Sequence, residues 1–286
     1  MWNLNYDSIS EIDSILKENG KEILSKLLGQ NFLTSRQGRE RVVELMNLES
    51  GMKAWEVGPG LGAITHLVLK AGVDLTCFEI DHGFAEILRT KAFGDEKGFT
   101  LVEGDALKTL FNYSYTPDRI IGNLPYNVGS VIIARLIERS ILPDLMVFTL
   151  QKEVVERMCA KPSDESYSSF SVLTQLDYEN KLALTLKKGC FWPQPQVDSA
   201  VVVMKKRDKS LVSDELRPVF LPLIRDLFSQ RRKTIKNNLT SSKYGNLGKD
   251  AISELISKAG LTGGERAEAL SFEDLIRIAE SAKSFS

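Results

Sequence analysis

The chain of 286 residues is poor in the residue types that bind metals or form disulfides. It has only three cysteines, Cys77, Cys159 and Cys190, and two histidines, His66 and His82. The cysteines are odd in number and widely spaced, and no histidine lies at metal-ligand spacing from one of them. We therefore expect neither a disulfide framework nor a metal site, and this sparse use of cysteine favours the reducing cytoplasm.

Long apolar runs and an excess of charge are also missing. No stretch approaches the roughly 18 apolar residues of a membrane span. Residues 1–7 have neither the basic nor the apolar region of a secretory signal, and we expect no membrane partner. Because the formal net charge is only −1, any binding of nucleic acid would need a local basic patch.

What the sequence does contain is a regular alternation of apolar strands and amphipathic helices. This alternation is typical of an α/β fold with a doubly wound, mostly parallel sheet. The predicted strands cover about 52–57, 74–79, 99–103, 118–122 and 145–150, with a final pair at 182–186 and 200–205. The predicted helices cover about 36–48, 62–71, 83–91, 129–139, 151–160 and 168–177.

The same patterns divide the chain into three regions. Apolar residues at helical spacing over 9–28 predict a helical N-terminal extension, residues 1–28. The alternating pattern predicts one α/β domain over 29–207. From Lys205 to Lys243 basic residues outnumber acidic ones, and the pattern then stays helical to the end. We therefore predict a small all-helical domain over 208–286.

Glycines and acids follow the first predicted strands. The loop Gly58-Pro59-Gly60-Leu61-Gly62 comes directly after the first strand, and glycines there let a ligand approach the backbone. Its spacing is G-x-G-x-G rather than the G-x-G-x-x-G of a dinucleotide fold. Glu56, just before the loop, suits an amino-acid-like cation better than a pyrophosphate. Methionine-end contacts are expected at Gly58 and Gly60.

Two further acids end the next strands. Glu79 ends the second strand, where an acid can accept from both ribose hydroxyls. Asp105 ends the third and could accept from an adenine amino group. Either acid alone could equally be a solvated strand-end charge. Together with the glycine loop, they favour a site for S-adenosylmethionine.

The tetrapeptide Asn123-Leu124-Pro125-Tyr126 ends the fourth strand. Taken alone, it is more simply a turn, because Asn and Pro are common in turns. Beside a methyl donor it suits a flat base that carries an amino group. The Asn123 side-chain oxygen and the Leu124 carbonyl can accept from that group, Pro125 fixes their geometry, and Tyr126 can stack on the base.

Together, these motifs strongly resemble those of a known family, the KsgA/Dim ribosomal RNA adenine dimethyltransferases, which are related to the Erm macrolide-resistance methyltransferases. The resemblance runs from about residue 29 into the C-terminal region. The matching motifs, in family order, are Gly29-Gln30-Asn31-Phe32-Leu33, Glu56-Val57-Gly58-Pro59-Gly60, Glu79-Ile80-Asp81, Gly104-Asp105-Ala106, Gly122-Asn123-Leu124-Pro125-Tyr126-Asn127, Leu150-Gln151-Lys152-Glu153-Val154, Phe191-Trp192-Pro193-Gln194-Pro195-Gln196-Val197-Asp198-Ser199 and Gln230-Arg231-Arg232-Lys233-Thr234.

The resemblance implies a Rossmann-like S-adenosylmethionine-dependent methyltransferase sheet with a small all-helical C-terminal domain. It adds Asn31 and Leu33 to the cofactor contacts, with Asn123 serving both cofactor and target. It makes Phe191 the second aromatic of the target pocket, opposite Tyr126. Trp192 occupies a variable position of the family and receives no role.

The resemblance also implies a substrate: two adjacent adenines near the 3′ end of 16S rRNA in the small ribosomal subunit. It implies a monomer that does not act on DNA. We expect RNA phosphates to be contacted by Arg225, Arg231, Arg232, Lys233 and Lys236. Three alternatives stay open: an Erm-type methyltransferase of 23S rRNA, a DNA adenine methyltransferase, and a non-catalytic RNA-binding assembly factor.

Overall fold

The computed structural model describes residues 4–19 and 31–285. The second half of the predicted N-terminal helical region and the Gly29-Gln30 pair lie outside these residues. The chain forms two compact units. One unit comprises residues 1–155 and 179–206, and the other comprises residues 156–178 and 207–286.

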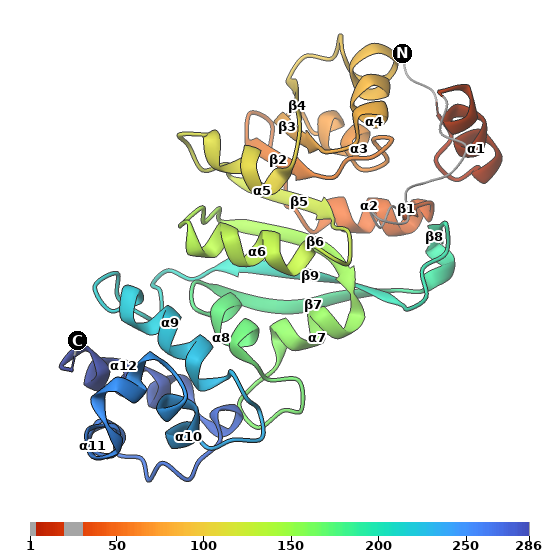
Figure 1. Cartoon of the computed structure of the whole chain (residues 1–286). Coiled ribbons are helices and arrows are strands. Elements are labelled where there is room, and N and C mark those ends of the chain that lie inside the picture. Colours follow the sequence, from red (N-terminus) through yellow and green to blue (C-terminus); the bar gives the residue numbers. More distant parts are fainter. Residues whose placement is uncertain (1–3, 20–30, 286) are drawn as a thin grey trace. The chain divides into compact units, whose positions relative to one another are not determined.

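The first unit is built on a seven-stranded sheet with strand order β4-β3-β2-β5-β6-β9-β7 (Figure 1). Neighbouring strands from β4 to β6 run parallel, and β9 runs antiparallel to β6. The predicted α/β fold with a mostly parallel sheet is thus confirmed. The strands are β2 (Lys53–Val57), β3 (Asp74–Glu79), β4 (Phe99–Glu103), β5 (Arg119–Asn123), β6 (Leu145–Gln151), β7 (Tyr178–Leu186) and β9 (Ser199–Lys206).

The helices of this part of the chain are α1 (Ile9–Glu18), α2 (Arg36–Glu44), α3 (Thr65–Lys70), α4 (His82–Ile87), α5 (Ala106–Thr109), α6 (Gly129–Glu138) and α7 (Lys152–Cys159). Helix α1 precedes the first strand, helices α2 to α6 lie between strands in the chain, and α7 begins in this unit and ends in the other. The prediction of one α-helix over 83–91 is wrong at its end, because a π-helical segment, Leu88–Ala92, replaces the last turn. Asp81 is the N-cap of α4, and its side chain accepts a hydrogen bond from the Phe84 amide.

A second, two-stranded sheet was not predicted. Strand β1 (Phe32–Leu33) pairs antiparallel with β8 (Phe191–Trp192), so that Phe32 lies opposite Trp192 and Leu33 lies opposite Phe191. The Cys190 carbonyl accepts from the amides of Thr34 and Ser35, at 2.9 and 3.2 Å. This pairing joins two segments that are about 160 positions apart in the sequence, so it depends on the tertiary fold.

The second unit is helical and has its own core. Its helices are α8 (Ser169–Gln175), α9 (Arg217–Leu227), α10 (Ile235–Thr240), α11 (Lys249–Lys258) and α12 (Phe272–Lys283). Tyr167, Val172 and Leu176 belong to the same buried cluster as the helices after residue 216. The Arg217 guanidinium is also paired with the buried Asp177 carboxylate. The predicted boundary at 207/208 lies within one residue of the division at 206/207, but the prediction placed residues 156–178 in the α/β domain, whereas they belong to the helical unit.

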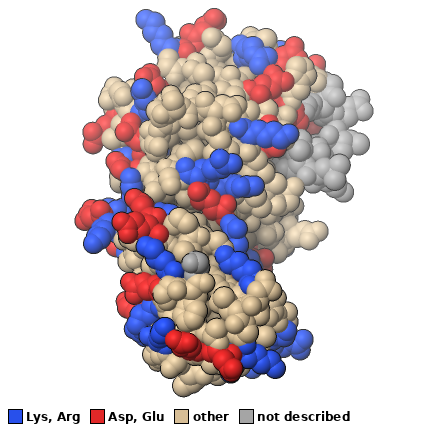
Figure 2. All heavy atoms as spheres, turned by 60° about the vertical axis from the view of Figure 1, so that its left-hand side comes forward, with Lys and Arg blue, Asp and Glu red and all other residues tan. Residues whose placement is uncertain are grey.

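On the face drawn in Figure 2, lysine and arginine are interspersed with aspartate and glutamate, in keeping with the formal net charge of −1. Within the described residues, no helix is long and apolar enough to cross a membrane.

Candidate cofactor and target-base site

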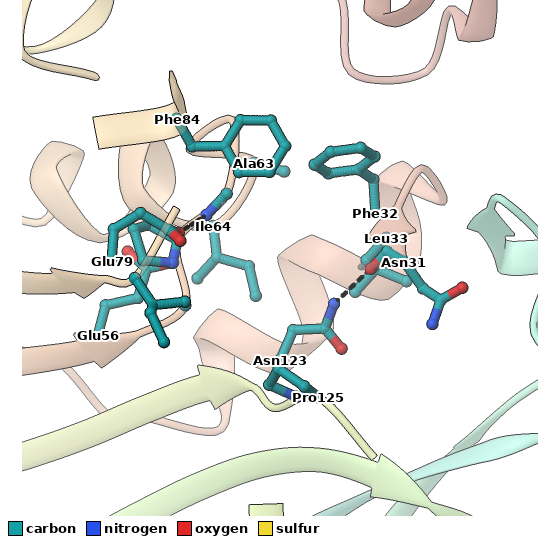
Figure 3. Close-up of a pocket in the computed structure, with 14 residues that line it drawn as sticks. Asn31, Phe32, Leu33, Glu56, Ala63, Ile64, Glu79, Phe84, Asn123 and Pro125 are labelled. Carbon is teal, nitrogen blue, oxygen red and sulfur yellow. Dashed lines mark hydrogen bonds between the residues drawn. The ribbon is translucent and has the colours of Figure 1, made fainter. Parts of the chain in front are cut away.

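The loops after β2, β3 and β5 meet at the carboxyl edge of the sheet and enclose a cavity, which we call the main cavity (Figure 3). Its lining residues are Asn31, Phe32, Leu33, Glu56, Gly58, Pro59, Gly60, Ala63, Ile64, Glu79, Ile80, Phe84, Asn123 and Pro125. Seven predicted cofactor residues are among them: Asn31, Leu33, Glu56, Gly58, Gly60, Glu79 and Asn123. The topology therefore brings these residues together at one site, where open α/β sheets bind ligands.

Glu79 is the best-anchored acid of the main cavity. Its side chain is buried, and its two carboxylate oxygens accept from the Gly60 amide at 3.0 Å and the Asp81 amide at 2.8 Å. A carboxylate oxygen can accept more than one hydrogen bond. The carboxylate thus ties the glycine loop to the end of β3.

Gly60 allows the loop to take this shape. Its φ of +57° is a left-handed conformation that side chains disfavour, and a Cβ there would lie 3.1 Å from the Phe32 ring. Figure 3 shows the rings of Phe32 and Phe84 on the same side of the main cavity, opposite Asn123 and Pro125. The two rings meet edge to face, with centroids 5.7 Å apart. Phe32 thus packs directly against the loop.

Glu56 lies deeper, at the end of β2. It is almost fully buried, and burial raises the pKa of its carboxyl to about 7, against a favourable hydrogen bond from the Thr65 hydroxyl at 2.7 Å. The nearby Glu79 carboxylate raises the pKa further. A cationic ligand group beside Glu56 would favour the ionised form and so lower this pKa.

The Glu56 pKa predicts how stability depends on pH. Between pH 4.5, the ordinary pKa of the group, and about 7, the folded state binds more protons than the unfolded state, so stability falls as pH rises and then levels off. Glu56→Gln removes this ionisation. We expect the variant to gain about 3 kcal/mol of unfolding free energy relative to the parent between pH 4.5 and 8. Urea denaturation at both pH values measures the gain, and an equal difference at both would contradict the buried carboxyl's raised pKa.

Asp105 lines a second cavity beside the main cavity. The two cavities share Gly58, Ile80 and Pro125. The Asp105 side chain accepts from the Leu107 amide at 2.9 Å and so caps the start of α5. The walls of the second cavity are largely apolar and include Phe78, Ile80, Leu107 and Ile132. A largely apolar cavity with one carboxylate suits a heterocycle with an amino group.

Asn123 is the last residue of β5, directly before the predicted base-binding residues Leu124, Pro125 and Tyr126. Its side-chain amide donates to the Asn31 carbonyl at 2.8 Å (Figure 3). This bond commits the NH2 end and leaves the oxygen of the amide to accept from a ligand. The Leu124 side chain is buried and its amide donates to the Thr149 carbonyl at 3.1 Å, so only its carbonyl is suited to a ligand.

The two predicted stacking aromatics line neither cavity. The Tyr126 hydroxyl lies 2.6 Å from the Ser199 hydroxyl, and burial raises the Tyr126 pKa, which keeps the phenol neutral. Phe191 is only 4% exposed and packs in the sheet core with Leu33 and Val201. The role of both rings as walls of a base pocket stays a prediction.

The predicted RNA-binding residues lie in the helical unit. Arg225 is in the last turn of α9, residues 231–233 connect α9 to α10, and Lys236 is in α10. Arg231 and Arg232 are exposed, and the Arg231 guanidinium lies 4.0 Å from the Glu268 carboxylate. Exposure makes these two arginines accessible to a polyanion.

Apolar members of the site were missed from the sequence. Phe32, Ile64, Ile80 and Phe84 line the main cavity but look like ordinary core residues. For Ile80 the sequence offers one signal, its place directly after the strand-end acid Glu79; the structure shows that it is 52% exposed. Across residues 4–19 and 31–285, no cluster of three or more His, Cys, Asp or Glu side chains could hold a metal ion.

Two solved structures share the fold. A dimethyladenosine transferase from Plasmodium falciparum matches with a TM-score of 0.71 and 21% identity, covering 85% of this chain and 94% of its own. The 23S rRNA methyltransferase ErmE matches with a TM-score of 0.64 and 21% identity, covering 87% and 98%. At this level of identity the likeness shows the methyltransferase fold alone.

Sequence comparison goes further. A ribosomal RNA small subunit methyltransferase A of Treponema denticola is 42% identical over 281 residues, which are 96% of this chain and 95% of that protein. A protein of the same name from Borreliella burgdorferi is 37% identical, covering 99% and 97%. The family model for ribosomal RNA adenine dimethylase matches residues 23–284. These matches confirm the resemblance seen in the motifs, and the chain belongs to the ribosomal RNA adenine dimethylase family.

Proposed function

We propose that the protein transfers methyl groups from S-adenosylmethionine to N6 of two adjacent adenines near the 3′ end of 16S rRNA, acting as a cytoplasmic monomer on the small ribosomal subunit. The observation that carries the proposal is the position of Asn123. Its amide lies in the wall of the same cavity as Glu79, with the NH2 end tied to Asn31 and the oxygen left to accept. Cofactor and target base would therefore meet at one residue.

The residues of the two cavities fit the cofactor by their chemistry. Glu79 would accept from the ribose hydroxyls, Asp105 from the adenine amino group, and Glu56 would face the methionine ammonium. The apolar walls Ile80 and Leu107 would sandwich the adenine. When bound, the cofactor supplies a sulfonium methyl that is already activated for transfer.

The task left to the protein is alignment and electrostatic help. Adenine N6 is a poor nucleophile, because its lone pair is delocalised into the ring. Two acceptors for the N6 hydrogens, the Asn123 oxygen and the Leu124 carbonyl, favour the more pyramidal and more nucleophilic amine. The proton leaves to water, and a second transfer follows when the remaining N6 hydrogen again faces an acceptor.

The target base must first leave its helix. Unstacking costs a few kcal/mol, which stacking on aromatic side chains can offset. Tyr126 and Phe191 are the proposed rings, and the basic residues of the helical unit would hold the phosphates of the folded RNA.

The direct test is methylation of small ribosomal subunits that lack the modification, with nucleoside mass spectrometry and mapping of the product. We expect N6,N6-dimethyladenosine at two adjacent positions near the 3′ end of 16S rRNA. Product on 23S rRNA or on DNA would overturn the substrate assignment. Cofactor binding without transfer to any nucleic acid would instead support a non-catalytic assembly factor.

The basic turn before α10 predicts a change in RNA binding. Arg231→Ala combined with Arg232→Ala should weaken binding of small subunits and reduce the slope of log affinity against log salt by about 1.5, because two phosphate contacts are lost. The matched control is Arg36→Ala with Arg41→Ala, a second pair of exposed arginines, each paired with a glutamate of its own helix. An unchanged slope in the first double variant would show that the turn does not face RNA.

A further inference from the structure

The two-stranded sheet of β1 and β8 joins segments with different proposed tasks. Strand β1 lines the main cavity with Phe32 and Leu33, whereas β8 carries Phe191, the proposed wall of the base pocket. Three hydrogen bonds to a single acceptor, the Cys190 carbonyl, fasten the pair: the Thr34 amide and hydroxyl at 2.9 and 3.1 Å, and the Ser35 amide at 3.2 Å. The two segments therefore form one piece of structure.

Trp192 extends this piece to the cavity wall. Its ring stacks on Phe32, with centroids 6.4 Å apart and planes 16° apart. Phe32 in turn lies against Gly60 and meets Phe84 edge to face. Trp192 thus forms the outer layer of a wall whose inner layer, Phe32 and Phe84, lines the main cavity.

Phe32 belongs to a buried hydrophobic cluster. The cluster contains Leu61 and Ala63 of the glycine loop region, with Trp192 packed against it. Backbone hydrogen bonds fix β1 but leave the ring of Phe32 free to turn about its side-chain bonds. Among the contacts above, the flat face of Trp192 is the one that comes from the β8 segment.

We propose that Trp192 is a positioning residue: it presses Phe32 against the glycine loop, and so ties the affinity for S-adenosylmethionine to the segment that carries Phe191. The inference rests on the proposed function and deepens it. From this positioning role we expect binding of the small subunit at the Phe191 segment to tighten cofactor binding. Coupling between two binding sites is reciprocal, so cofactor binding should then tighten subunit binding by the same factor.

The experiment compares the full-length parent with Trp192→Ala and Trp192→Phe. Calorimetry gives the Kd of S-adenosylhomocysteine with and without unmethylated small subunits, and initial rates give kcat and KM. Tyr115→Ala is the matched control, since it truncates a partly exposed aromatic of the same unit that lines neither cavity. Thermal denaturation of every variant reports folding.

For Trp192→Ala we expect the Kd of S-adenosylhomocysteine to rise about three- to tenfold, the range that an aromatic pair contributes. The effect of subunits on that Kd should disappear, and kcat at saturation should change by less than about threefold. Trp192→Phe should restore both Kd and coupling, and Tyr115→Ala should leave them unchanged. A lower kcat, a higher KM and a lower melting temperature together would show that Trp192 is merely structural and would overturn the proposal.

Two further outcomes separate this inference from the function on which it rests. If the parent protein binds no S-adenosylhomocysteine and methylates no RNA, the proposed function itself fails. If the parent binds and methylates but Trp192→Ala matches it in Kd and in coupling, only the positioning role of Trp192 is overturned.

Discussion

Asn123→Ala should lower kcat for rRNA methylation by about 10²- to 10³-fold, the loss seen when one preorganised hydrogen-bonding group is removed from a transition state. KM for the small subunit should change by less than about threefold, because the contact matters most when N6 becomes nucleophilic. The structure makes the prediction specific: the Asn31 carbonyl holds the NH2 end of the amide at 2.8 Å, so the oxygen end is the one lost to the substrate. Single-turnover rates with saturating cofactor measure the effect.

The matched control is Asn112→Ala, which removes an exposed asparagine of the same unit that lines neither cavity. It should leave kcat within about twofold of the parent, as surface substitutions do. Comparable losses in kcat and in affinity for the subunit after Asn123→Ala would mean that Asn123 only shapes the loop. In that case the acceptor for N6 would have to be sought elsewhere in the wall.

Glu79→Ala should weaken binding of S-adenosylhomocysteine by about 10²-fold or more, because hydrogen bonds to a charged group contribute about 1.5–3 kcal/mol each and a ribose offers two. Part of the loss arises within the protein. The Gly60 and Asp81 amides both donate to this carboxylate, and without it the glycine loop loses its anchor to β3. Calorimetry measures the Kd directly and does not depend on turnover.

Glu103→Ala provides a sharp control for Glu79→Ala. Glu103 is also a strand-end acid, at the end of the neighbouring β4, but it pairs with His82 and Arg89 and lines neither cavity. We expect its removal to leave the Kd within about twofold, since exposed ion pairs contribute little. Equal effects of the two substitutions would show that the acid at 79 acts only through general electrostatics.

Local patterns were enough to predict the elements that place the site. Strands 74–79 and 99–103 match β3 and β4 residue for residue, because each is an apolar run with a glycine or an acid at its end. Glu56 and Glu79 were expected at one edge of the sheet, since a parallel sheet collects its carboxyl ends there, and both line the main cavity. The sequence alone therefore predicted that Glu56, Glu79 and Asn123 lie close together.

Features that depend on tertiary contacts were beyond the sequence. A two-residue strand such as β1 or β8 has no periodicity to detect, and its pairing joins distant segments. Apolar cavity residues such as Phe32 and Phe84 cannot be told from core residues by type. Asp105 lines a neighbouring cavity that shares Gly58, Ile80 and Pro125 with the main cavity, so its place with Glu79 in one cofactor site stays a prediction.

The interrupted second unit has a consequence for how such a protein can be cut or recombined. Because residues 156–178 belong with 207–286, the chain passes between the units at three points: 155/156, 178/179 and 206/207. A fragment that stops at 206 would lack the helices that bury Tyr167 and Leu176, and these side chains would be exposed. A graft or deletion of the helical unit must therefore be made at all three junctions together. A single recombination event cannot transfer this unit alone, because residues 179–206 of the other unit lie between its two segments.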